Sequence, residues 1–166
     1  VNHDGQYEMV VGDGPRHPFY GPARQPSPPD IIWHMTPWGF ALAPELMIKP
    51  LPKSSTLASY KGSFDDQSKD NDIHLYIVTL DLIYSGHEKE AWAFFDDAWP
   101  AFFEFWSRHG QWDSNGNTEN RTRQEEEQYR KAEFRNELVG EICTSLFARS
   151  LSGVDRNRFL GKTCNY

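Results

Sequence analysis

Residues 75–99 constrain the fold of this chain most strongly, because they predict two helices joined by a tight turn. In the first half, Leu75, Val78 and Leu82 recur at helical spacing and form one apolar face. Gly86 follows where this helix should end, since glycine adopts the positive φ of a helix terminus without strain. The second half combines small and aromatic side chains: Ala91, Trp92, Phe94, Phe95, Ala98 and Trp99. This composition suits close packing of two antiparallel helices and predicts an αα-hairpin.

The predicted hairpin resembles a single tetratricopeptide-like repeat. Gly86 lies at the turn, Ala91 follows five residues later, and Phe95 and Ala98 complete the pattern. Such repeats need about three stacked copies for stability, and the sequence has no second copy at a spacing of about 34 residues. An ordinary αα-hairpin is therefore the simpler interpretation.

The N-terminal third predicts a small antiparallel sheet. Residues 31–35 and 39–42 are short apolar segments separated by turn-forming residues, which is typical of a β-hairpin. Residues 7–11 are expected to add a third strand. Six prolines within residues 12–30 exclude a helix there, so this segment should run extended.

The rest of the chain predicts helices, and the overall expectation is an α+β, mainly α fold. Residues 1–52 would form a β and Pro-rich N-terminal element, and residues 53–166 a bundle of three to four helices around the hairpin. Pro100 should end or kink the second helix of the hairpin. Residues 122–151 predict one final helix, and the last fifteen residues are expected to form a tail.

The two cysteines leave two interpretations open. Cys143 and Cys164 either form a disulfide that ties the tail to the last helix, or they are two unrelated thiols. One pair of cysteines does not decide between these by number alone. A disulfide would imply an oxidising, extracytoplasmic compartment, periplasmic or secreted.

Composition excludes some partners. The formal net charge is −7 at pH 7, which argues against a nucleic acid because binding of its phosphates requires a basic face. The sequence contains no apolar run of about 18 residues, so no transmembrane segment is expected. Aromatic residues make up 14% of the chain, which predicts a core built from a few large side chains.

The first eleven residues, VNHDGQYEMVV, contain a calcium-loop pattern. Asn2, Asp4 and Glu8 match the third, fifth and ninth positions of a D-x-[DN]-x-D-G loop. Gly5 supplies the sharp turn, and Gln6 would offer its backbone carbonyl. This loop and the strand that follows resemble FG-GAP and related repeat proteins, although the first-position Asp is absent. The resemblance implies a Ca²⁺ site and descent from a longer β-repeat polypeptide; the alternative is a turn that never held metal.

Candidate catalytic residues are scattered along the chain. Asp81 lies within the apolar part of the hairpin, where it would form an ion pair or act with a histidine from the N-terminal third. The histidines of that third are His3, His17 and His34. The sequence has no nucleophile elbow, phosphate loop or dinucleotide fingerprint. A structural ion pair is therefore the favoured interpretation of Asp81.

The leading functional hypothesis is a non-catalytic extracytoplasmic accessory or protein-interaction subunit. Its candidate partner-binding residues are the aromatics Phe19, Tyr20, Trp33 and Trp38. The order of the LAPELMIKPLP, DLIYSG and AWAFFDDAWP segments resembles the C-terminal part of uncharacterised bacterial exported proteins, a resemblance that implies no known activity. The alternatives are a secreted or periplasmic hydrolase that uses a carboxylate and a histidine, and a calcium-stabilised binding module.

Overall fold

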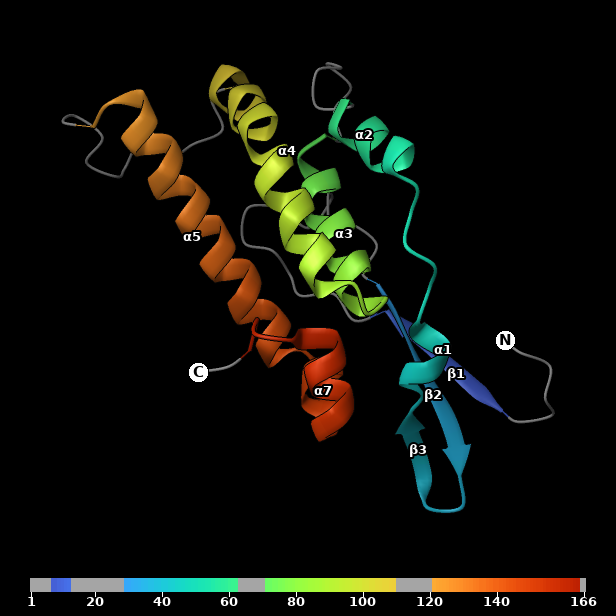
Figure 1. The fold of residues 1–166 in the computed structure, drawn as a ribbon. Coiled ribbons are helices and arrows are strands. Elements are labelled where there is room, and N and C mark those ends of the chain that lie inside the picture. The colour runs from blue at the N-terminus through green and yellow to red at the C-terminus, as the bar shows by residue number, and fades with distance from the viewer. Residues whose placement is uncertain (1–6, 13–28, 63–70, 110–120, 165–166) are drawn as a thin grey trace.

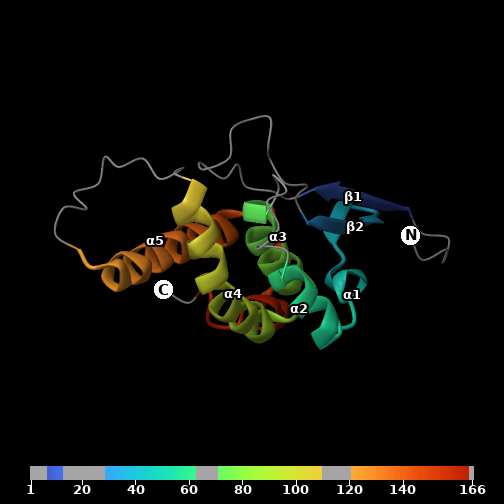
Figure 2. The ribbon, with the colours of Figure 1, turned by 90° about the horizontal axis from the view of Figure 1, so that it is seen from above.

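The computed structural model describes residues 7–12, 29–62, 71–109 and 121–164. The strands are β1 (Glu8–Gly12), β2 (Asp30–Thr36) and β3 (Gly39–Leu42), and the helices are α1 (Pro44–Met47), α2 (Ser54–Gly62), α3 (Asn71–Tyr84), α4 (Glu88–His109), α5 (Arg123–Thr144), α6 (Leu146–Ser150) and α7 (Gly153–Leu160). The α3–α4 hairpin lies between the long α5 and the sheet (Figures 1 and 2). The expected α+β, mainly α fold is confirmed.

The sheet is antiparallel with the strand order β1-β2-β3. Its predicted strands are confirmed to within one residue at each end. Thr36 closes the β2–β3 turn, because its hydroxyl donates to the Gly39 carbonyl (2.7 Å) and accepts from the Trp38 N–H (3.2 Å). Gly39 has a φ of +118°, a conformation that side chains other than glycine rarely adopt. The β2–β3 hairpin runs away from the helices as an arm (Figure 1).

The predicted αα-hairpin is also present, and its aromatic side chains form the centre of the core. Trp99 is 1% exposed, and the rings of Phe95, Phe102 and Phe134 lie with their centroids 5.3–5.8 Å from its own. These separations are in the range that aromatic pairs prefer. Phe134 comes from α5, so this cluster joins the third long helix to the hairpin.

The sequence left two outcomes open at Pro100, a helix end or a kink. The helix does not end there, because α4 continues through Pro100. Proline removes one intrahelical hydrogen bond and crowds the preceding turn. Here its ring lies on the exposed side, while Trp99, Phe102 and Phe103 are buried on the other. Burial of these side chains stabilises the turns on both sides of the proline.

The prediction of one helix over residues 122–151 followed by a tail is wrong. α5 ends at Thr144, and Ser145 turns the chain and begins α6, with its hydroxyl accepting from the Ala148 N–H (3.1 Å). Serine is among the preferred N-cap residues because its side chain satisfies a free backbone N–H of the first turn. The expected tail contains α7, whose Phe159 is buried against Phe147.

Cys143 and Cys164 form a disulfide, with their Cα atoms 5.5 Å apart. Beside it, the Trp92 indole N–H donates to the Thr163 hydroxyl (2.8 Å), which in turn donates to a Glu88 carboxylate oxygen (2.7 Å). The C-terminal segment is therefore attached covalently to α5 and by hydrogen bonds to the start of α4.

Candidate functional site

One face of the three-stranded sheet is apolar from the core to the end of the arm. Side chains that are paired across strands share a face, and three successive sets lie on this one. The sets are Val11 and Ile31, then Met9, Trp33 and Leu42, then Tyr7, Met35 and Phe40. Ile31 is fully buried in the core, whereas the last set is exposed. We call Tyr7, Met9, Met35, Trp38 and Phe40 the arm patch.

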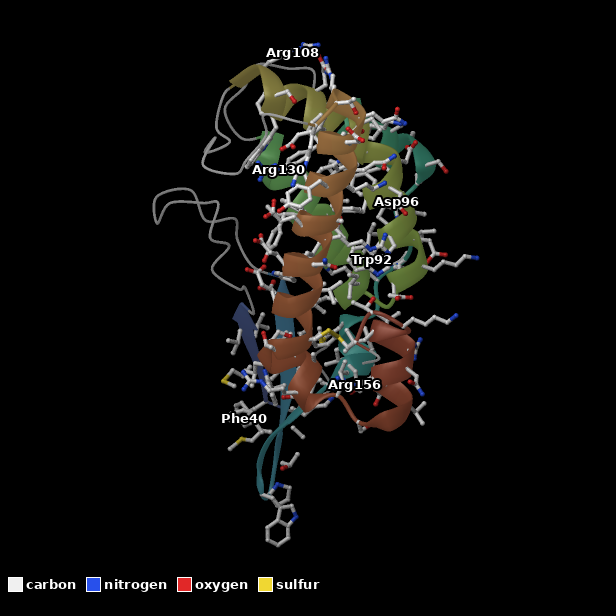
Figure 3. The ribbon with its side chains drawn as sticks, turned by 90° about the vertical axis from the view of Figure 1, so that its left-hand side faces the viewer. Phe40, Trp92, Asp96, Arg108, Arg130 and Arg156 are labelled. Atoms are coloured by element: carbon white, nitrogen blue, oxygen red, sulfur yellow. A yellow bond between two sulfur atoms is a disulfide. The ribbon has the colours of Figure 1, made fainter. Side chains whose placement is uncertain are left out.

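The side chains of the arm patch are large and apolar, yet they are exposed to solvent and not packed into the core. Trp38, at the turn, is 96% exposed, and Met35 and Phe40 are about half exposed (56% and 49%). Figure 3 shows Phe40 on the hairpin, which continues past the ends of the helices. Single exposed apolar side chains are ordinary, but a contiguous group that contains aromatic residues and methionine is typical of an interaction site.

The arm also has a free strand edge. The Met35 N–H donates to the Tyr7 carbonyl (2.9 Å), so the backbone of Met35 faces β1 and its pair with Phe40 is not hydrogen-bonded. The alternation along β3 then directs the polar backbone groups of Ala41 toward β2 and those of Phe40 and Leu42 outward. These outward groups have no hydrogen-bond partner among the described residues.

Apart from the shortness of β3, which has four residues, the described residues give this edge little protection against pairing. Proteins block exposed edge strands with lysine, proline or bulges, whereas β3 reads Gly-Phe-Ala-Leu. The charged residues within the three strands are the acids Glu8 and Asp30, and the register places both on the face opposite the arm patch. No charged side chain of the three described strands therefore lies on the same face as the arm patch.

Two of the four aromatic residues predicted to bind a partner lie on or beside this surface. Trp38 lies at its most exposed point, and Trp33 is half-buried on the same face, between the core and the arm patch. Phe19 and Tyr20 lie outside the described residues. The other members of the patch were missed, although the period-two alternation of the predicted strands places Met35 and Trp33 on one face.

The predicted calcium ligands receive no support from the described part of the chain. Asn2, Asp4 and Gln6 lie outside it, and Glu8 lies in β1, on the face opposite the arm patch. Within the described segments, no three His, Cys, Asp or Glu side chains gather as a metal site would require.

The candidate catalytic residues Asp81 and His34 interact with different partners and not with each other. Asp81 pairs with Lys49 (2.6 Å), an ion pair as favoured from the sequence, while His34 pairs with Glu45 (2.8 Å). His87 contacts the Lys49 backbone carbonyl through Nε2 (2.7 Å). Asp81 therefore does not meet His34, and His3 and His17 lie outside the described residues.

A row of carboxylates runs along α5 at four-residue spacing. Burial raises the pKa of Glu137 above its ordinary value, and the neighbouring Glu133 raises it further. Burial also raises the pKa of Glu141, with Glu137 adding to the shift, while a hydrogen bond from the Tyr76 hydroxyl (3.0 Å) opposes it. One carboxylate oxygen of Glu137 is buried without a hydrogen-bond partner in the described structure.

Replacing Glu137 with glutamine is expected to stabilise the protein at neutral pH but not in acid. A carboxyl whose pKa is raised by folding gives stability below its unfolded pKa, and this stability is lost as the pH rises through the folded value. Relief of like-charge repulsion at four-residue spacing should add about 0.5 kcal/mol at pH 7. Urea unfolding of the variant and the wild type at several pH values measures the difference.

Glu125→Gln is the control with the opposite sign. Hydrogen bonds from the Thr122 backbone N–H and hydroxyl lower the pKa of Glu125, so its contribution is present above the unfolded pKa and is lost as the pH falls. This variant should therefore be less stable than the wild type at neutral pH, with the difference vanishing in acid. The same direction of change in both variants would contradict the assigned shifts.

Comparison with family models, curated proteins and solved structures finds no match for this chain. None of the helices in the described segments combines the length and apolar character that crossing a membrane requires.

Proposed function

We propose that this chain is a non-catalytic, extracytoplasmic protein-binding module, and that its partner adds an extended strand to the free edge of β3. The observation that carries the proposal is the arm, where the apolar face of the sheet continues out of the core to the exposed Trp38. In strand addition, backbone hydrogen bonds supply affinity and alternate side chains supply specificity. The extracytoplasmic location is supported by the disulfide, since disulfides persist in oxidising compartments.

The surface defines the chemistry of the partner strand. Its side chains on the patch side should be apolar, because they would lie beside Phe40 and Leu42. A second copy of the chain fits less well, because two chains with a net charge of −7 each would repel each other.

A photo-crosslinking experiment tests the proposal. A benzophenone amino acid at position 38, introduced in cells of the source organism, should yield a discrete crosslinked partner that mass spectrometry identifies. The matched control is the same amino acid at Val154, which is 83% exposed on α7. A partner captured equally from both positions, or from position 154 alone, would contradict the assignment of the arm.

The captured partner, once purified, allows a quantitative prediction. Trp38→Ala and Phe40→Ser should each weaken binding by about 2 kcal/mol, roughly 30-fold, as expected for central aromatic contacts. Val154→Ser should leave the affinity unchanged, and isothermal titration calorimetry measures all three. Unchanged affinity in both arm variants would contradict the proposal.

A further inference from the structure

A small cavity of about 230 Å³ lies on the other side of the sheet from the arm patch. Val10 and Ile32 line it from the second face of the sheet, and Leu46 and Met47 line it from α1. The C-terminal end of α3 supplies the remaining wall, with Asp81 among its residues. The cavity therefore has apolar walls on the sheet and on α1, and a mixed wall of Asp81, Tyr84 and Ser85 at the end of α3.

Among the described residues, the charged groups that line this cavity are two carboxylates and one ammonium. Asp81 pairs with Lys49 at 2.6 Å, and Asp30 is the second acid. The Lys49 and Asp81 side chains are 60% and 45% exposed, and an ion pair this exposed contributes about 0–1 kcal/mol. An incoming cation can therefore displace the Lys49 ammonium at little cost, and among the described lining residues the carboxylates outnumber the ammonium by one.

We propose that this cavity binds a primary alkylammonium group, with the ammonium at Asp81 in place of Lys49 and the alkyl chain against the apolar walls. The Lys49 side chain already presents such a group to Asp81, so the carboxylate is positioned for this contact. Contact of the Lys49 carbonyl with His87 holds the Lys49 backbone in place while its side chain moves aside. The ammonium belongs either to a small free amine or to a lysine side chain of another protein.

NMR titration of the full chain with n-pentylamine tests this, with n-pentanol and n-pentanoate as the neutral and anionic equivalents. The methyl signals of Met47 and Ile32 report on the cavity. Saturable shifts of these signals are expected with the amine, with weaker binding of the alcohol and none of the carboxylate. Parallel titration with Nα-acetyl-lysine N-methylamide identifies the source: tighter binding than n-pentylamine assigns the site to a lysine side chain, and weaker binding assigns it to a free amine.

Two variants should change the affinity in opposite directions. Asp81→Asn keeps the shape of the side chain but removes its charge, and should weaken amine binding up to about fivefold, the equivalent of about 1 kcal/mol. Lys49→Met removes the competing ammonium and should strengthen binding several-fold. The control is Asp97→Asn, which breaks the comparable exposed pair with Lys61 (2.9 Å) at another site.

The outcomes separate clearly. Loss in Asp81→Asn and gain in Lys49→Met, with Asp97→Asn unchanged, would establish the site. No saturable shift in the wild type, or equal binding of the amine and the carboxylate, would overturn it. An Asp81→Asn variant that fails to fold leaves the Lys49→Met gain as the test, and no gain there would also overturn the proposal.

Discussion

Replacing Trp99 with alanine is expected to lower the free energy of unfolding by about 3–5 kcal/mol, the range for large aromatic side chains in protein cores. The side chain is 1% exposed and contacts aromatic rings of both α4 and α5, so its loss opens a cavity where the two helices meet. Total stabilities of domains are about 5–15 kcal/mol, so the variant should be near its unfolding threshold. Urea unfolding followed by circular dichroism measures the change.

Two tryptophan controls make this prediction specific. Trp38→Ala removes the same side chain from a position that is 96% exposed, and should change stability by less than about 0.5 kcal/mol. Trp99→Phe should cost much less than Trp99→Ala, because it keeps a ring and removes an indole N–H that has no hydrogen-bond partner among the described residues. Equal losses in the alanine variants at positions 99 and 38 would contradict the assigned core.

Removing the disulfide by Cys143→Ser and Cys164→Ser together is expected to lower the free energy of unfolding by about 3 kcal/mol. The bond closes a loop with a sequence separation of 21 residues, and cross-links of this size typically contribute about 2–4 kcal/mol. The loss should appear as a lower urea midpoint. Because Phe159 and Leu160 are buried independently of the bond, α7 should still fold against the hairpin at low urea.

Reductant provides the control for this double variant. Wild-type protein unfolded in the presence of dithiothreitol should reproduce the lowered midpoint, while the serine variant should not respond to the reductant. Trp92→Phe removes the hydrogen bond to Thr163 but leaves the disulfide intact, so its cost should be smaller, about 1 kcal/mol. A wild-type midpoint that is insensitive to reductant would show that the cross-link does not stabilise the fold.

The sequence was sufficient to predict the elements with an uninterrupted pattern. The αα-hairpin followed from apolar spacing around Gly86, and the sheet from short apolar strands. The break after α5 was missed because Leu138, Ile142 and Leu146 continue a helical spacing. In the structure, Ser145 ends α5 and changes the phase of the apolar face, so that Leu146 is 45% exposed and its neighbour Phe147 is buried.

The candidate site was less predictable for two physical reasons. Trp38 lies in a predicted turn and could be named as a partner-binding residue from the sequence. The exposure of Met35 and Phe40 could not be predicted, because it depends on how far the core extends along the arm. That limit is set by the packing of helices distant in sequence. The Lys49–Asp81 pair likewise joins residues on separate elements, 32 positions apart, which local pattern does not reveal.

Amide hydrogen exchange of β3, with and without the captured partner, tests the proposed strand addition most directly. In the free protein, the amide of Ala41, which faces β2, should exchange slowly, while the outward amides of Phe40 and Leu42 exchange fast. The partner should slow exchange at Phe40 and Leu42 and leave Ala41 nearly unchanged. Protection that appears elsewhere, with Phe40 and Leu42 still exchanging at their free rates, would contradict docking at this edge.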